Sequence, residues 1–296
     1  MKLLKYLPVL AVLTSCQPKE DVYSKFLTNQ IPQDTPLEYT GVEIPDDQKV
    51  HKGIFSPDFT AYYYTVSDHA YAKFDVYVVK KQNGSWSEPQ LAFFNSAYSE
   101  HGMSFSPAGN TLFFSSTRPT GVEAVADTWH LWKTEQVDGT WGEPEWIDIP
   151  NLRDKLVSHP TVAQSGALYF HSSNLDYTDM HLYQSLPEKD AYGPAERVDL
   201  GLDATVGTLS PYVAPNEEYL LFATIGEQLD LMVVFSDGRG GWTHPKRLND
   251  RINQRGQGNP YVTPDGTFLF FTAEDEQEAT WQVKWVNVER ELVSNE

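Results

Sequence analysis

Pairs of apolar runs, separated by turns rich in proline and glycine, recur five times along the chain. In the clearest copy, Phe105-Ser106-Pro107-Ala108-Gly109 leads into the second apolar run at 112–114. The copies begin at Phe55, Phe105, Val162, Val213 and Val262, so successive copies are spaced by 50, 57, 51 and 49 residues. A period near fifty made only of short strands is typical of a β-propeller. The pattern therefore predicts an all-β fold of five blades.

Each repeat carries two further strand signals, which predicts four-stranded blades. Apolar third strands at 75–79, 130–132, 181–183 and 230–233 lead to tight turns such as Asn83-Gly84 and Asp138-Gly139. The fifth repeat lacks an outermost strand after 281–286, whereas 37–44 lies unused before the first repeat. We expect 37–44 to complete the last blade, because closing the ring removes exposed strand edges. Six blades are the alternative, if 17–44 contains a degenerate one.

These repeats resemble the TolB-type, WD-repeat-like propellers of bacterial envelope proteins. The best matches to their repeat are Phe105-Ser106-Pro107, Ser115-Ser116-Thr117-Arg118 and Asp75-Val76-Tyr77. The resemblance covers residues from about 50 to about 290 and implies the fold. It does not select a function, because such propellers serve as scaffolds, binding proteins and enzymes.

The N-terminal segment resembles the signal peptide of a bacterial lipoprotein. Lys2 and Lys5 precede an apolar run that is too short to span a membrane, and Leu13-Thr14-Ser15-Cys16 resembles a lipobox. The resemblance implies cleavage before Cys16 and lipid on its sulfur. We therefore expect a signal peptide at 1–15, a lipidated tether at 16–36 and the propeller at 37–296. Gln17 and the run Lys19-Glu20-Asp21 favour an outer membrane lipoprotein exposed on the cell surface, with the periplasmic side as the alternative.

Charge and cysteine content exclude several classes of protein. The net charge is −19 over 296 residues, so the surface repels phosphate backbones and we expect no nucleic-acid partner. The single cysteine, Cys16, cannot form an intramolecular disulfide. We expect a monomeric domain attached to the membrane through Cys16.

Polar residues just before the innermost strands mark a candidate site at the mouth of the central channel. They are His51, His101, His159 and Asn259, with Leu209 in the fourth blade. We interpret the three histidines as equivalent positions that converge on the axis. They either bond to the backbone, contact a ligand or hold a divalent metal, but no strong metal motif is present and we expect no cofactor.

Loops between second and third strands should surround this ring, because they emerge on the same face of the propeller. Their candidate ligand-binding residues are Arg118, which suits a carboxylate, and Tyr71, Asn174, Asp176 and Tyr177, which suit a sugar. We expect a binding protein for a glycan, peptide or protein at this long-loop face. A carbohydrate-active enzyme, either a glycoside hydrolase or a lyase, is one alternative, and an assembly scaffold is another. No phosphate-binding loop or serine-hydrolase motif supports other chemistry.

Overall fold

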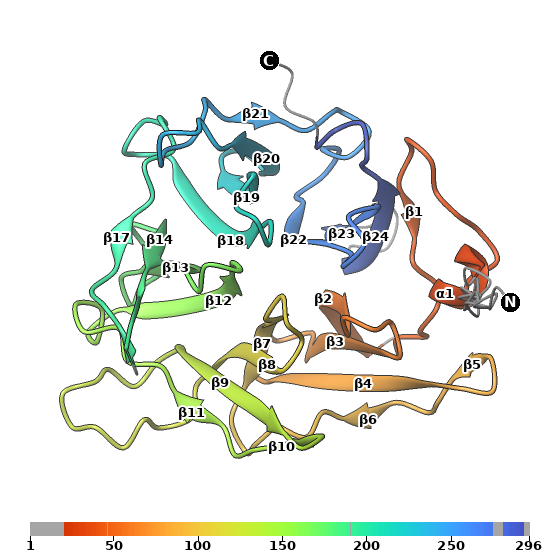
Figure 1. Cartoon of the computed structure of the whole chain (residues 1–296), viewed down its shortest axis with the longest axis horizontal. Helices are drawn as coiled ribbons and strands as arrows, with labels where there is room; N and C mark the ends of the chain where they lie inside the picture. The colour runs from red at the N-terminus through yellow and green to blue at the C-terminus, as the bar shows by residue number, and fades with distance from the viewer. Residues whose placement is uncertain (1–20, 46, 190, 275–280, 293–296) are drawn as a thin grey trace, which may run out of the picture.

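Five antiparallel sheets surround one axis in the computed structural model (Figure 1), which describes residues 21–45, 47–189, 191–274 and 281–292. The predicted all-β fold of five four-stranded blades is confirmed. The chain enters each of the first four blades at the innermost strand and leaves it at the outermost one. All hairpin turns between first and second strands consequently lie on one face, which we call the turn face. The connections between second and third strands form the long-loop face.

The first two blades each carry an extra short strand that pairs antiparallel with the end of the third strand. Blade 1 contains β2 (Gln48–Phe55), β3 (Ala61–Asp68), β4 (Phe74–Gln82), β5 (Ser85–Trp86) and β6 (Gln90–Leu91). Blade 2 contains β7 (Glu100–Phe105), β8 (Thr111–Ser116), β9 (His130–Val137), β10 (Thr140–Trp141) and β11 (Glu145–Trp146).

Blades 3 and 4 follow the same order. Blade 3 contains β12 (Leu156–Val162), β13 (Leu168–Ser173), β14 (His181–Ser185) and β17 (Glu196–Arg197), with a small hairpin of β15 (Pro187–Glu188) and β16 (Ala191–Tyr192). Blade 4 contains β18 (Gly207–Val213), β19 (Tyr219–Ile225), β20 (Leu229–Phe235) and β21 (Lys246–Arg247).

Blade 5 is completed from the other end of the chain, as the sequence predicts. Its strands β22 (Gly258–Val262), β23 (Phe268–Glu274) and β24 (Trp281–Asn287) are joined by β1 (Leu37–Glu38), which pairs antiparallel with β24. The Tyr39 N–H donates to the Val283 carbonyl at 2.8 Å and extends this pairing. In Figure 1, β1 lies beside β24 at the outer edge of the ring. The outer edge of β24 is thus covered, which removes a site for aggregation.

A short helix, α1 (Val22–Phe26), precedes the closing strand, in a segment predicted to be a tether. Phe26 is fully buried, with its ring centroid 5.2 Å from that of Phe55, 5.2 Å from that of Phe268 and 5.3 Å from that of Trp285. Its carbonyl accepts a hydrogen bond from the Tyr39 hydroxyl. Residues 22–36 therefore belong to the folded domain, because an aromatic side chain anchors them. Among the described residues, no helix is long and apolar enough to cross a bilayer.

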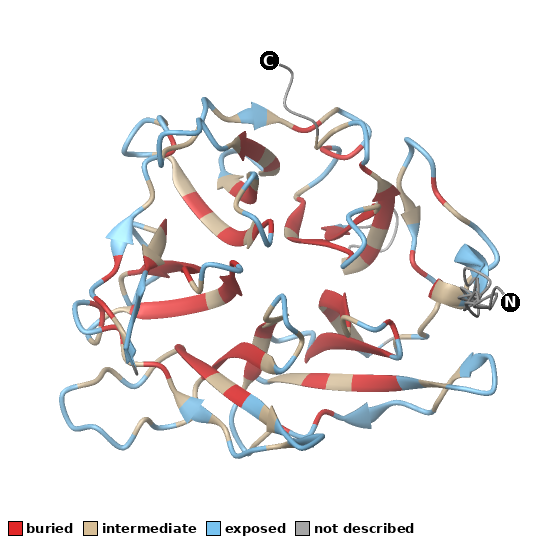
Figure 2. Cartoon of the chain, viewed as in Figure 1, coloured by how far each residue is buried: buried red, intermediate tan, exposed pale blue. Residues whose placement is uncertain are grey.

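Burial follows the radial position of each strand. The second strands β3, β8, β13, β19 and β23 are buried along most of their length, because blades pack against both of their faces. The short outermost strands β6, β11, β17 and β21 are largely exposed, as Figure 2 shows. Aromatic and branched side chains suit such pleated, packed surfaces. The core is accordingly a set of layers between blades.

Every innermost strand contains an irregularity near the long-loop face. In blades 2 to 5 the register shifts just after His101, Ser158, Leu209 and Gly258. The residues that follow these four positions, Gly102, His159, Ser210 and Asn259, all have positive φ angles of 50–60°. In blade 1 the shift lies at His51, between Val50 and Lys52. Such bulges re-aim side chains, and here they direct polar groups toward the axis.

Replacing Phe26 with alanine should lower the free energy of unfolding by about 3–5 kcal/mol, because it leaves a cavity between the first and last blades. Tyr23→Ala is the matched control, since Tyr23 lies on the same helix with half of its surface exposed. Urea denaturation measures both. An F26A protein as stable as the control would show that α1 is not part of the fold.

Candidate functional site

Seven polar residues from blades 1, 2, 3, 4 and 5 gather around the axis near the long-loop face, together with the second-strand residue His171. We call this group the axial cluster, and it consists of His51, Lys52, His101, Ser158, His159, Ser210, Asn259 and His171. The structure brings together all four of the predicted channel residues His51, His101, His159 and Asn259. Leu209 lies at the corresponding level of blade 4.

The three predicted histidines do not occupy equivalent positions. His101 pairs with Ser115 of the second strand, and its counterpart in blade 3 is Ser158, which pairs with His171. His159 is the bulge residue that follows, with a φ of 58°. In blade 1 the bulge falls one residue earlier, so Lys52 pairs with Thr65 and takes the place of His101. The prediction of one equivalent ring is therefore wrong, because His159 lies one position after the counterpart of His101 and the bulge of blade 1 falls at His51 itself.

The rings of the cluster are in direct contact between blades 2 and 3. The His101 and His159 centroids are 4.5 Å apart, and those of His159 and His171 are 4.7 Å apart. Gly102 allows this approach, because a Cβ atom there would lie 3.1 Å from the His159 Cα atom. Ser158 Oγ lies 2.8 Å from His101 Nε2 and 3.1 Å from His159 Nδ1. The hydroxyl thus connects two imidazoles across the blade boundary.

Blades 4, 5 and 1 complete the network through backbone groups. The Ser210 N–H donates to His171 Nδ1 at 3.1 Å, and the Ser210 hydroxyl lies 3.2 Å from Asn259 Oδ1. The Asn259 amide in turn donates to the His51 carbonyl. His51 Nε2 lies 2.7 Å from the Ser67 hydroxyl. These bonds join the polar groups around the axis and fix the side chains that line it.

Burial makes all four axial histidines neutral at physiological pH. Desolvation lowers the pKa of His51 to about 4 and that of His171 to about 3, with Lys49 adding repulsion at His51. The pKa of His101 and the pKa of His159 are also held well below the usual value, first by burial and then by neighbouring histidines and Lys52. The imidazoles therefore act as uncharged hydrogen-bonding groups.

Lys52 is the cation of the cluster. Lys52 is only 5% exposed, and desolvation lowers the pKa of its amine to about 8. Its charge acts on both His101 and His159 and lowers their pKa values further. No signal in the sequence singled out this residue, because a lysine between His51 and Gly53 is ordinarily assigned to the surface.

The described part of the chain holds no group of three or more His, Cys, Asp or Glu side chains placed to bind a metal ion. His101 Nε2 and His159 Nδ1 both face the Ser158 hydroxyl. These two ring nitrogens therefore contact a hydroxyl group of the protein.

An aromatic rim borders one side of the axial cluster. It is formed by Tyr71, Phe74, Trp129 and Trp281 from the loops and strand starts of blades 1, 2 and 5. Trp129 lies against His101 with centroids 4.0 Å apart, and Phe74 contacts both His51 and His101 at 4.9 and 5.5 Å. Phe74 and Trp129 themselves meet edge to face at 5.8 Å. The rim and the cluster thus form one continuous surface.

Tyr71, a predicted ligand-binding residue, is the exposed member of this rim. Its ring is 44% exposed and lies 5.7 Å from His51. Its hydroxyl accepts hydrogen bonds from Lys49 Nζ at 2.9 Å and from Trp281 Nε1 at 3.2 Å. Because two donors occupy the lone pairs of this oxygen, its own proton remains available. The ring is therefore fixed in place and presents a flat apolar face and a donor.

A groove of about 570 Å³ reaches the rim from the boundary between blades 5 and 1. The closing segment 38–45 forms one wall, and Trp281, Gln282 and Val283 form another. Tyr62 and Tyr64 also line it. Its size lies within the range of small-ligand pockets, and its lining mixes aromatic and polar groups.

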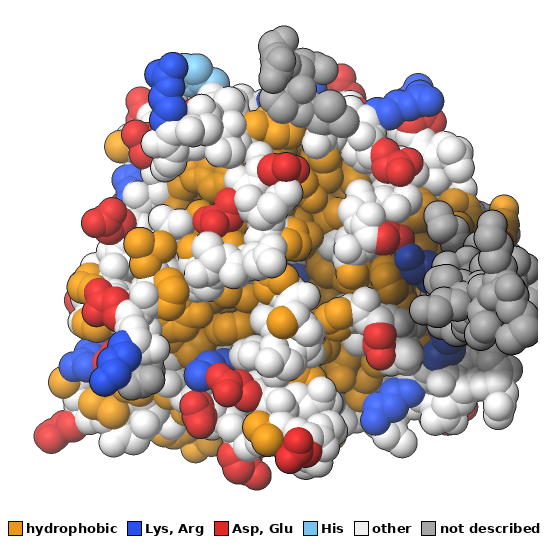
Figure 3. Space-filling model, viewed as in Figure 1, with side chains coloured by type: hydrophobic (Ala, Val, Ile, Leu, Met, Phe, Trp, Pro, Cys, Tyr) orange, Lys and Arg blue, Asp and Glu red, His pale blue; other side chains and the backbone are white. Residues whose placement is uncertain are grey.

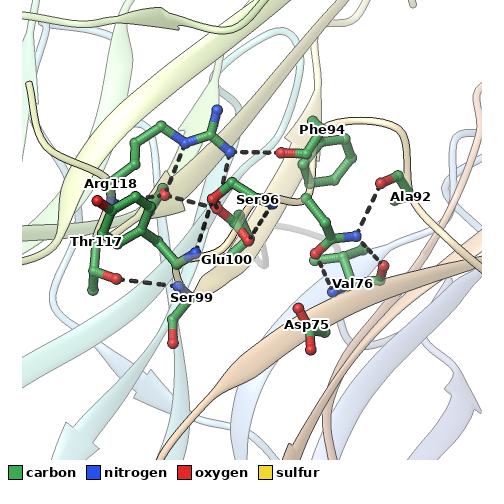
Figure 4. Close-up of polar contacts among 12 residues, drawn as sticks. Asp75, Val76, Ala92, Phe94, Ser96, Ser99, Glu100, Thr117 and Arg118 are labelled. Atoms are coloured by element: carbon green, nitrogen blue, oxygen red, sulfur yellow. Dashed lines mark hydrogen bonds and ion pairs between the residues drawn. The ribbon is translucent and has the colours of Figure 1, made fainter.

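Arg118, the predicted carboxylate clamp, is committed to the interior of blade 2 (Figure 4). Its Nη2 lies 2.9 Å from Oε1 of Glu100, which is completely buried, and it also donates to the Phe94 carbonyl. Its Nε donates to the Ser116 hydroxyl at 3.1 Å. Ser96 Oγ donates to the same Glu100 oxygen at 2.6 Å. Arg118 thus serves a buried carboxylate of its own chain and does not join the axial cluster.

The remaining predicted residues form a tight turn in blade 3. The Asp176 carboxylate accepts from the Thr178 hydroxyl at 2.6 Å, and Asn174 accepts from Lys155 Nζ at 2.9 Å. Tyr177 is 62% exposed at this turn, with a φ of 65°. No contact joins these three described residues to the axial cluster, so they form a separate feature of the long-loop face.

The surface around the ring has a distinct distribution of side chains. In the space-filling view of one face, hydrophobic side chains gather around the centre and Lys and Arg lie toward the periphery (Figure 3). Acidic side chains are scattered between them. The abundance of acidic side chains on this face agrees with the composition of the chain, which has 41 acidic and 22 basic residues.

No family model matches the sequence, and no curated protein matches it. The fold is similar to solved propellers. A putative TolB from Agrobacterium tumefaciens is 14% identical, covers 83% of this chain and 79% of its own, and has a TM-score of 0.52. A glycoside hydrolase is 12% identical over 86% of this chain and 92% of its own, with a TM-score of 0.54. An endo-arabinase from Bacteroides thetaiotaomicron is 10% identical over 90% and 99%, with a TM-score of 0.52. TolB-like proteins and carbohydrate-active enzymes therefore share this fold, and the likeness extends to the fold alone.

Arg118→Ala should lower the free energy of unfolding by about 3–5 kcal/mol, because it leaves the buried Glu100 carboxylate without its cation. Arg251→Ala is the control, since Arg251 pairs with Asp34 on the surface and should cost only about 0–1 kcal/mol. Chemical denaturation of both variants measures the difference. If Arg118→Ala left stability unchanged but removed ligand binding, the result would support the prediction that Arg118 binds a ligand carboxylate.

Proposed function

We propose that this protein is a lipid-anchored binding protein of the cell envelope that holds a glycan at its long-loop face. The observation that carries the proposal is the fixed, exposed ring of Tyr71, which contacts His51 of the axial cluster and is bonded to Trp281 of the groove wall. Flat aromatic rings bordered by hydrogen-bonding groups suit sugars, whose faces are apolar and whose edges are polar. A peptide or protein partner at the same face is the alternative.

The contacts of three loop acids favour binding over catalysis at their own positions. Glycoside hydrolysis requires two carboxyl groups about 5–9.5 Å apart that flank the bond to be broken. Among the described loop acids, Asp68 accepts from the Ala72 N–H, Asp176 accepts from Thr178, and Asp179 pairs with His181. These three carboxylates therefore bond to groups within their own loops. A carbohydrate-active enzyme would have to draw its acids from elsewhere on this face.

The anchoring geometry supports the choice of the long-loop face. Cys16 and the proposed signal peptide 1–15 lie outside the described residues, but α1 begins at Val22. Six residues reach at most about 20 Å, so a lipid on Cys16 would hold α1 close to the membrane. Lys25 of α1 pairs with Asp265, which belongs to a hairpin turn of the turn face. The long-loop face would then point away from the bilayer, toward soluble ligands.

Cys16→Ser should release the protein from membranes into the soluble fraction. Cys16 is the single cysteine, and each buried methylene of an acyl chain contributes about 0.8 kcal/mol of membrane affinity. Fractionation in high salt, followed by immunoblotting, measures the distribution. A C16S protein that stays with membranes would contradict lipid anchoring, whereas wild-type protein on intact cells accessible to protease would support surface exposure.

Tyr71→Ala should weaken binding to the glycans that wild-type protein selects on an oligosaccharide array by about tenfold, since a lost stacking contact is worth about 1.4 kcal/mol. Tyr71→Phe keeps the ring and should retain most of the affinity. Tyr177→Ala is the matched control, because Tyr177 is an exposed tyrosine on another loop of the same face. Equal losses in Y71A and Y177A, or no glycan bound by wild-type protein, would contradict the proposal.

A further inference from the structure

We propose that the axial cluster binds a carboxylate group, with the Lys52 ammonium as its counter-ion, and that the ligand of this protein is therefore an acidic sugar. The assignment of the carboxylate to a sugar rests on the proposed function. The anion site itself depends only on the residues around the axis.

Lys52 differs from every other residue at this level of the ring. The positions that pair with the same point of the second strand in blades 2 to 5 are His101, Ser158, Leu209 and Gly258, none of which is charged at neutral pH. The positive charge of the cluster therefore comes from Lys52 alone, a residue with only 5% of its surface exposed. Taking an ammonium out of water costs several kcal/mol unless a partner compensates it.

No such partner is present in the described residues. No hydrogen bond or ion pair involves Lys52 Nζ there, and its pKa is lowered by desolvation without any compensating carboxylate. Acids are plentiful, and other lysines such as Lys25, Lys73 and Lys133 pair with them. The acids of the described residues thus leave the axial cation without a partner. An external anion is the group that would complete this site.

His171 adds an uncharged donor to the same cluster. Its Nδ1 accepts from the Ser210 N–H, so the neutral ring carries its proton on Nε2. No described residue accepts a hydrogen bond from this Nε2–H. The His171 ring stacks on His159, on which the charge of Lys52 acts. The axis therefore offers one cation and one free N–H donor to an anionic group.

The charge balance selects a monoanion. The four histidines are neutral, so Lys52 supplies a single positive charge, and a carboxylate matches it. Phosphate carries close to two negative charges at neutral pH and would leave an uncompensated charge in a protein of net charge −19. Tyr71, Phe74 and Trp129 of the aromatic rim are suited to pack against a sugar ring that carries this carboxylate. A uronate, which is a sugar with a carboxylate group, matches both the Lys52 cation and the aromatic rim.

Histidine ring signals in NMR spectra report directly on this cluster. Sodium acetate and sodium glucuronate should shift the ring signals of His101 and His159 in wild-type protein, and glucuronate should bind at least tenfold more tightly than glucose. Lys52→Met should weaken the binding of acetate and glucuronate at least tenfold. Lys80→Met, which changes an exposed lysine of the same blade, should leave both unchanged, and Lys52→Arg should retain binding.

The pH dependence provides a check that requires no variant. The charge of Lys52 acts on His101 and His159, whose pKa values lie well below the usual 6.5. The other two axial histidines, His51 and His171, also have lowered pKa values. Affinity for acetate should therefore be constant from pH 6 to 7.5. It should fall as the pH rises through the Lys52 pKa of about 8, because the neutral amine attracts no anion. If Lys52→Met does not fold, this profile decides the question.

The outcomes separate this inference from the proposed function. If neither acetate nor glucuronate shifts the axial histidines, or if inorganic phosphate binds more tightly than both, the carboxylate site is overturned. Glucose binding as tight as glucuronate, with no loss in K52M, overturns it as well and leaves glycan binding intact. If acetate binds through Lys52 but Tyr71→Ala affects no glycan, the carboxylate site stands and the glycan proposal fails.

Discussion

Closure of the ring depends on the aromatic contacts between the first and last blades. Phe26, Tyr39 and Trp285 pack against Phe55 and Phe270 at this boundary, so residues from both ends of the chain share one buried cluster. The strand pair β1–β24 alone contributes two residues to closure, which is little against the entropy of joining the chain ends. The buried aromatic area provides the larger part of the stabilisation. All five innermost strands converge on one axis only while this boundary holds.

That convergence is what creates the candidate site. An innermost strand has no neighbour on its axial side, so a bulge there turns polar side chains toward the other blades. His159 rests on Gly102 and bonds to Ser158, which reaches His101 in the next blade. The polar network therefore serves the fold and lines the axis at the same time. Lys52 is the exception, because none of these hydrogen bonds involves its ammonium group. A buried charge without a partner destabilises the fold, so Lys52 is a candidate functional residue.

The period of the sequence was sufficient to predict the fold, whereas the site needed the structure. Spacing near fifty residues predicted five blades, and the missing last strand predicted its replacement by 37–44. Counting could not reveal the bulges, because one extra residue in a strand leaves the repeat period almost unchanged. The bulge of blade 1 falls one residue earlier, so Lys52 and not His51 takes the strand position that His101 holds in blade 2. The short helix around Phe26 has no periodicity to detect. The burial of Lys52 and the ion pair of Arg118 with Glu100 depend on contacts between segments distant in sequence.

The Lys52 ammonium, which has no anionic partner among the described residues, is the proposed binding site for a ligand carboxylate. A crystal structure of the protein soaked with glucuronate is the decisive experiment. A carboxylate oxygen should lie about 2.7–3.2 Å from Lys52 Nζ, with the sugar ring against the aromatic rim. A structure in which Lys52 pairs with a carboxylate of the protein itself, or in which glucuronate lies on the turn face, would contradict this proposal.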